Sequence, residues 1–100
     1  MMKILDCGYY EKHENNIWRC VFDVEDVEEA YIQKAKEFDD FYDGPCFEIE
    51  ILYNEAEHKV FNPADLVYID FNGDALCFDY DLDMSQQEYV LECIKKEILV

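Results

Sequence analysis

The chain has 100 residues, a length that fits one domain, and we expect residues 1–100 to form a single compact acidic α+β domain. Apolar residues make up 51% of it and aromatic residues 16%, which excludes a disordered acidic tail, because such tails lack the residues that build a core. The formal net charge is −17, and a field of that sign disfavours direct binding to nucleic acid or to an anionic membrane.

The cysteines and the N-terminal segment indicate a reducing compartment. The chain has five cysteines without C-x-x-C spacing, which predicts neither a disulfide framework nor a zinc site. The opening "MMKILDCGYYEKH" lacks the long apolar segment of a signal peptide, and no stretch approaches the roughly 20 apolar residues of a membrane span. We therefore expect a cytoplasmic protein with reduced thiols.

Two alternating segments open the chain and predict an antiparallel hairpin. "KILDCGYY" and "IWRCVFDV" flank the polar stretch "EKHENN". Pairing them about that turn places Tyr9 opposite Trp18 and Cys7 opposite Cys20, with all four side chains on one face. We expect that face to be buried.

Helical spacing follows in "DVEDVEEAYIQKAKEFDDFYDG". Its apolar stripe recurs at intervals of three or four residues and consists of Val27, Tyr31, Ala35, Phe38 and Tyr42. Asp26 is suited to cap the helix start, and Gly44-Pro45 to end it. The opposite face carries Lys36 and five carboxylates, those of Glu28, Glu29, Asp39, Asp40 and Asp43. The sequence thus predicts a helix with an acidic outer face.

Strict alternation in "CFEIEILY" predicts a strand that is buried on one side. Its inward residues would be Phe47, Ile49, Ile51 and Tyr53, and its outward ones Glu48 and Glu50. After the turn "NEAE", the segment "HKVFNP" is expected to return as a short partner strand.

A second hairpin is predicted around Asn72-Gly73, a pair typical of a type I′ turn. It joins "ADLVYIDF" to "ALCFDYD". With those two residues at the tip, Val67 lies opposite Phe78 and faces inward, whereas Tyr68 faces solvent.

The last element is a helix. Ser85 is suited to cap it with Glu88 three residues later, and Val90 and Ile94 continue at helical spacing. The order β-β-α-β-(β)-β-β-α predicts an α+β fold, with a mostly antiparallel sheet of four to six strands and two helices packed on one face.

The aspartates of "CFDYDLDMSQQEYV" raise the question of a metal. Asp79, Asp81 and Asp83 have the spacing that opens a calcium loop, but Met84 and Val90 occupy the positions that need glycine and glutamate. Every second residue of a strand points the same way about 6.5 Å apart, so these carboxylates do not converge without a third element. We expect no cofactor, and a metal-dependent enzyme stays as a minor alternative.

A catalytic set is not evident. The chain's only serine is Ser85, already used as a cap, so no Ser-His-Asp triad can be built with His13 or His58. A Cys-His pair stays open, although thiols on core strands are usually inert. We therefore expect a protein that is not an enzyme.

The acidic and aromatic side chains are the remaining candidates for a functional surface. Carboxylates along strands and a helix form a rigid array of negative charge, comparable in density to a nucleic-acid strand, and aromatic residues supply contact area. If both helices cover the apolar face, the strand acids and the helix acids lie on opposite sides of the sheet. The candidate partner-binding residues are Glu28, Glu29, Asp39, Asp40, Asp43, Glu48, Glu50, Asp79, Asp81, Asp83, Phe41 and Tyr68.

These features predict an inhibitor that occludes a basic site on a nuclease or another nucleic-acid-binding enzyme. It would act either as a DNA mimic, in the manner of phage anti-defence or anti-CRISPR proteins, or as an immunity protein or antitoxin for a nuclease toxin. The alternative is an accessory subunit or a homodimer or larger homo-oligomer that docks through an exposed sheet edge.

Overall fold

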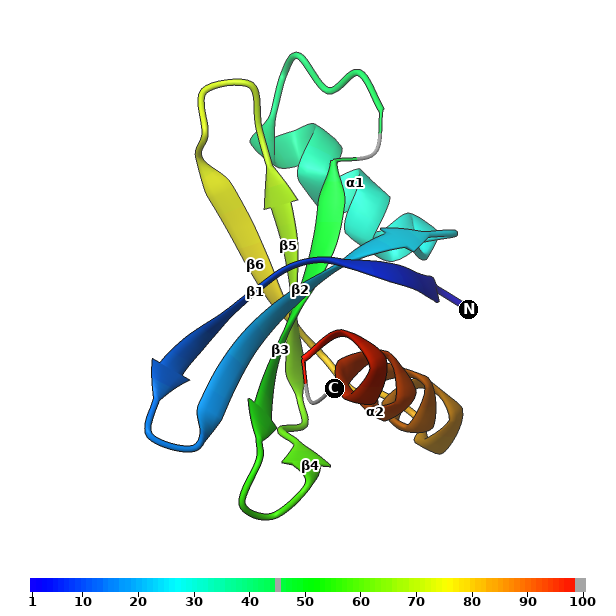
Figure 1. Cartoon of the computed structure of the whole chain (residues 1–100). Helices are drawn as coiled ribbons and strands as arrows, with labels where there is room; N and C mark the ends of the chain where they lie inside the picture. The colour runs from blue at the N-terminus through cyan, green and yellow to red at the C-terminus, as the bar shows by residue number, and fades with distance from the viewer. Residues whose placement is uncertain (45, 99–100) are drawn as a thin grey trace.

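The computed structural model of the protein describes residues 1–44 and 46–98 (Figure 1). The expected order of elements is confirmed, including the short return strand. The elements are β1 (Lys3–Glu14), β2 (Ile17–Glu25), α1 (Glu29–Phe38), β3 (Phe47–Asn54), β4 (Lys59–Val60), β5 (Ala64–Ile69), β6 (Ala75–Tyr80) and α2 (Met84–Glu97).

The strands form one antiparallel sheet in the order β1-β2-β3-β5-β6, with β4 paired to β3 beside that path. Figure 1 shows the strong twist that neighbouring strands acquire from the handedness of the backbone. Strands β1 and β6 are the two edges. The predicted α+β class, with a mostly antiparallel sheet, is thus confirmed.

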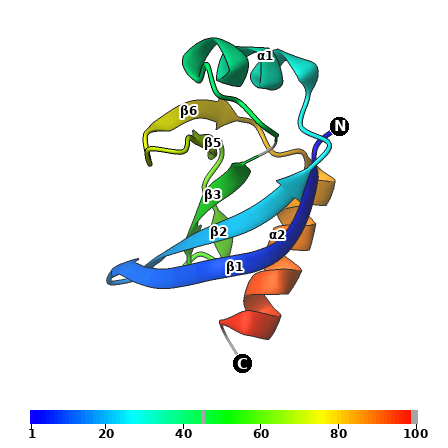
Figure 2. The ribbon, with the colours of Figure 1, turned by 90° about the horizontal axis from the view of Figure 1, so that it is seen from above.

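Both helices pack on one face of the sheet, as the sequence predicts. In Figure 2, α1 lies over β5 and β6, and α2 runs beside β1 and β2. Tyr31 of α1 packs edge-on against Phe78, and Val90 and Ile94 of α2 belong to the same buried cluster as Ala35 of α1. Within the described part of the chain, neither α1 nor α2 therefore covers the opposite face of the sheet.

The core comes from alternate residues of the central strands. All four inward residues predicted for β3 are buried, namely Phe47, Ile49, Ile51 and Tyr53. Leu66 of β5 and Phe22 of β2 pair with Ile49 from either side and are fully buried too. Burial of such side chains stabilises the fold by about 1.5 to 3 kcal/mol each.

The register of the first hairpin differs from the prediction. Cys7 lies opposite Phe22 and Tyr10 opposite Cys20, while Tyr9 is half exposed. The tip is the pair at positions 15 and 16, and β1 shifts its register at three places along its length. Each shift adds a residue on one strand, so no single register describes the whole hairpin.

The register of the second hairpin is also one residue from the predicted one. Val67 pairs with Cys77, and Tyr68 turns inward, with only 2% of its surface exposed. The connection is a longer loop in which Gly73 N donates to Asp70 O at 3.1 Å and Gly73 has φ +87°. Since one added loop residue moves every side chain to the other face, the prediction of an outward Tyr68 was wrong.

Both helix starts differ from the predicted ones. Asp26 has φ 56° and precedes α1, whose N-cap is Glu28. For α2, Asp83 Oδ1 accepts from Gln86 N at 2.8 Å, and the Gln86 side chain accepts from Asp83 N at 3.1 Å. The capping box is therefore Asp83-x-x-Gln86 rather than Ser85-x-x-Glu88. Both segments have residue types suited to a capping box, and the box that forms begins two residues earlier in the chain.

Helix α1 ends earlier than predicted. The apolar spacing continues to Tyr42, yet the helix stops at Phe38. Beyond it, Asp39 accepts hydrogen bonds from the Tyr68 hydroxyl at 2.6 Å and from Phe41 N at 2.9 Å. Those bonds hold the chain in a loop that leads back to β3.

Candidate functional site

The uncovered sheet face carries a row of directly opposed carboxylates. Glu50 of β3 pairs with Asp65 of β5, and Asp65 pairs with Asp79 of β6. These positions alternate with the buried residues of their strands, so all three side chains project from the face without helices. We call these three residues the acidic row; their strands lie about 4.8 Å apart.

The charges of the acidic row are only partly compensated. Burial raises the pKa of Asp65, and the neighbouring carboxylates Glu50 and Asp79 raise it further. At one end, Arg19 Nε donates to Glu50 Oε1 at 2.8 Å, and this bond raises the pKa of Arg19. Arg19 also reaches Glu11, so its charge is shared. The row therefore presents excess negative charge toward β6.

The face beside the row combines acid with small apolar side chains. Glu48 lies opposite Asp23 on β2 and opposite Val67 on β5, and Val67 lies opposite the exposed Cys77. The predicted outward orientation of Glu48 and Glu50 is confirmed, since their neighbours along β3 are buried. A partner on this face would meet carboxylates interspersed with apolar contacts.

A cleft of about 600 Å³ opens at one end of the sheet, between the loop after α1 and the β5–β6 turn. Figure 1 shows these two loops side by side beyond the ends of β3 and β5. Phe41 is 86% exposed and Phe71 96% exposed, so both rings lie almost entirely in solvent. The side chains that define this acidic aromatic cleft are Asp39, Phe41, Asp43, Tyr68, Asp70 and Phe71.

Hydrogen bonds fix two carboxylates of the acidic aromatic cleft. The Tyr68 hydroxyl donates to Asp39 Oδ2 at 2.6 Å, and burial together with that carboxylate raises the pKa of Tyr68. On the other wall, Asp70 Oδ1 accepts from Asn72 N at 2.9 Å and from Asp74 N at 2.8 Å. The Tyr68 hydroxyl and backbone N–H groups thus hold both acids in place before any ligand arrives.

The structure distributes the candidate residues from the sequence over several places. Asp39, Phe41, Asp43 and Tyr68 meet in the acidic aromatic cleft, and Glu48, Glu50 and Asp79 lie on the uncovered face. The acids predicted for the end of the first helix thus lie in the loop after α1, which ends at Phe38, whereas the strand acids lie on the sheet face without helices.

The remaining candidates are scattered. Glu28 accepts from the Tyr80 hydroxyl at 2.9 Å and from Met2 N at 3.2 Å, and Asp83 caps α2. Glu29 accepts from Gln33 at 2.7 Å, while Asp40 and Asp81 are exposed outside the helices and strands.

Three residues of these surfaces were not among the candidates from sequence. Asp65 alternates with the apolar residues of "ADLVYI", a signal that would have placed it outward. Asp70 and Phe71 enter the cleft only because the β5–β6 turn lies beside the loop after α1. No sequence pattern reports that proximity.

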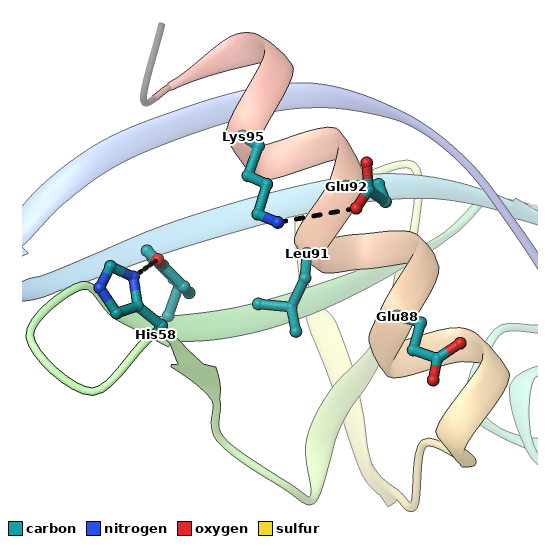
Figure 3. A pocket seen from close by; sticks show the side chains of 6 residues that line it. His58, Glu88, Leu91, Glu92 and Lys95 are labelled. Carbon is teal, nitrogen blue, oxygen red and sulfur yellow. Dashed lines mark hydrogen bonds and ion pairs between the residues drawn. The ribbon is translucent and has the colours of Figure 1, made fainter.

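A second pocket of about 400 Å³ lies between α2 and the β3–β4 turn (Figure 3). The Tyr53 hydroxyl and His58 Nδ1 are 3.3 Å apart, and Lys95 Nζ lies 3.7 Å from Glu92 Oε1. Figure 3 shows Leu91 pointing toward the His58 side and Glu88 pointing away from it. Lys95 compensates only one of the two glutamates, Glu88 and Glu92, so the lining of this pocket is weakly acidic.

Neither a metal-binding group nor a similarity to a known protein points to a function in the described part of the chain. Within residues 1–44 and 46–98, no three His, Cys, Asp or Glu side chains gather as a metal-binding group. In the same part of the chain, no helix has the length and apolar character to cross a bilayer. No protein family, curated protein or solved structure matches the chain. Function must therefore be argued from its surfaces.

Proposed function

We propose that the protein is a non-catalytic binding protein of the cytoplasm that occludes a basic site on a nucleic-acid-handling protein. The acidic row carries this proposal. Like charges directly opposite one another destabilise a sheet, and here Glu50, Asp65 and Asp79 are opposed on three adjacent strands. A cationic partner surface would relieve that repulsion and so gain affinity from it.

Two versions of this function differ in the surface that they use. A DNA mimic needs a distributed array of charge, and the acidic row places one carboxylate on each of three neighbouring strands, which lie about 4.8 Å apart. An immunity protein or antitoxin needs a few anchors, and exposed Phe41 and Phe71 amid carboxylates suit that use. In both versions the target is a nuclease or another nucleic-acid-binding enzyme.

The second candidate class is an accessory subunit or homo-oligomer. Strand β6 is a sheet edge with Ala75 and Cys77 exposed, so its outer backbone groups could pair with another chain. A second copy, however, would bring another net charge of −17 against the first. An accessory role would therefore also require a basic partner.

Charge-neutral variants test the proposal in a capture experiment from host lysate at low and high salt. Replacing the acidic row by Glu50→Gln, Asp65→Asn and Asp79→Asn should abolish capture of a basic nucleic-acid enzyme. The matched control removes the same charge elsewhere, by Glu37→Gln, Glu57→Gln and Glu97→Gln, and should retain capture. Equal retention by both triple variants would show that the row does not bind the partner.

A further inference from the structure

The acidic aromatic cleft contains two unusual rings. A phenylalanine as exposed as Phe41 or Phe71 leaves nearly its whole apolar surface in water, at 86% and 96% exposure. The two come from loops about 30 residues apart in the chain, yet both line one cavity of about 600 Å³. That volume lies within the range of about 300 to 1,000 Å³ typical of ligand sites.

The charge of the cleft determines whether a bound ligand is a cation or an anion. Asp39, Asp43 and Asp70 line it, and no basic side chain is among the described residues that do so. Both hydrogen bonds that Asp70 receives from the turn end on Oδ1, which leaves Oδ2 able to accept another. An anionic ligand would be repelled, and a purely apolar one would desolvate the carboxylates without compensating their charge. A cation, in contrast, would be attracted to the carboxylates and to the ring faces.

We propose that this cleft takes the side chain of an arginine from the protein partner. The guanidinium group is planar, weakly hydrated and able to stack on an aromatic face while donating several hydrogen bonds to carboxylates. Phe41 and Phe71 provide the faces, and the carboxylates of Asp39 and Asp70 are already held by backbone and tyrosine donors. Preorganised acceptors reduce the entropy lost on binding.

This inference rests on the proposed function, because it names the residue by which a basic partner is anchored. It also assigns the cleft a role separate from that of the acidic row. The row attracts a basic surface over some distance, whereas the cleft recognises one side chain at contact. Cys46 and Ile69 line the cleft, and Ile69 shares its sheet face with Val67, so one partner could contact both places.

The probe for the test is N-acetyl-arginine methylamide, with the neutral citrulline analogue as its control. In NMR titrations of the whole protein at low salt, the arginine probe should shift the ring signals of Phe41 and Phe71 saturably, and citrulline should not. A capped lysine should bind more weakly, because its ammonium group does not stack. Equal shifts with citrulline or lysine, or no shift of either ring, would overturn the arginine assignment.

A double variant, Phe41→Ala with Phe71→Ala, should weaken binding of the arginine probe about five- to tenfold. Both rings are exposed, so circular dichroism and the melting temperature should stay unchanged. Phe61→Ala removes a partly exposed ring elsewhere and should leave probe affinity unchanged. Unchanged affinity in the double variant would contradict the inference.

The two proposals fail separately. If the cleft ignores arginine while a basic enzyme is still captured through the acidic row, only the cleft assignment is lost. If the cleft binds the arginine probe but no nucleic-acid enzyme is captured in any salt, only the proposed function is lost.

Discussion

At Asp65 the fold places a carboxylate opposite two others, Glu50 and Asp79. Burial first, and then these two charges, raise the pKa of Asp65 above its ordinary value of 3.8. A raised pKa means that the folded state favours the protonated form. The stability contributed by that form is present at acid pH and is lost as the pH rises through the folded-state pKa.

We predict that Asp65→Asn stabilises the protein at neutral pH. The amide resembles the protonated acid, and removing one like charge from an exposed strand pair is worth a few tenths of a kcal/mol. Thermal unfolding should show a higher melting temperature for the variant at neutral pH and no difference at a pH well below 3.8. Asp81→Asn, outside the strands, is the control and should change little; a destabilised Asp65→Asn would contradict the electrostatic explanation.

Tyr68 links the core to the cleft. Its ring packs with Phe38, Tyr42 and Phe47, and its hydroxyl donates to Asp39 at 2.6 Å. A buried hydroxyl bonded to a charged acceptor is more stabilising than an ordinary exposed one. The position of Asp39 in the cleft therefore depends on this residue.

Tyr68→Phe should lower the free energy of unfolding by about 1 to 2 kcal/mol in chemical denaturation. The aromatic packing is kept, so the loss reports the hydroxyl and its carboxylate partner. Tyr10→Phe, at a half-exposed ring, should change stability by less than about 0.5 kcal/mol. If both variants are equally stable, the bond to Asp39 does not hold the loop.

Among the elements, α2 has an unambiguous start. Asp83 and Gln86 satisfy each other's backbone donors in a capping box, whereas Ser85 lies within the first turn. Loss of an N-cap side chain costs about 1 kcal/mol. The two candidate caps can therefore be distinguished by mutation.

Asp83→Ala should lower the free energy of unfolding by about 1 kcal/mol, and Ser85→Ala should leave it within about 0.5 kcal/mol of wild type. Urea denaturation of the two variants measures the difference directly. The reverse order of stabilities would show that the helix starts at Ser85.

The elements themselves follow from local pattern, but their pairings do not. In β3 every second residue is apolar over the whole strand, so its buried face is predicted correctly. In the second hairpin, Asn72-Gly73 indicates a tight turn, yet Asp70 satisfies two backbone donors with its side chain and stabilises a longer loop. That choice depends on side-chain hydrogen bonds, which alternation does not encode.

The candidate site is less predictable than the fold for the same reason. The outward direction of Glu48 and Glu50 follows from alternation alone. Predicting the acidic row requires the correct register between β5 and β6. Predicting the cleft requires knowing that two loops distant in sequence lie side by side. Tyr68 shows the consequence, since a one-residue slip turned a buried anchor into a supposed surface contact.

On the scale of the whole molecule, the net charge of −17 is spread over a body of 42 × 26 × 19 Å. Exposed charges at such separations repel one another until salt screens them. The folded state brings these charges closer together than the unfolded chain does, so self-repulsion reduces its stability.

The melting temperature should therefore rise as sodium chloride is added from low ionic strength, because screening relieves the repulsion. Potassium chloride at the same ionic strength should give the same rise, which separates screening from binding of a particular cation. A rise with one salt and not the other would point to a bound ion instead.

In the proposed function, the protein occupies a basic nucleic-acid site on its partner. The most direct measurement is competition, in which double-stranded DNA is added to the complex of the wild-type protein with a captured enzyme. The proposed function requires that DNA displaces the protein and that the protein in turn blocks DNA binding. A ternary complex, with both bound to the enzyme at once, would contradict it.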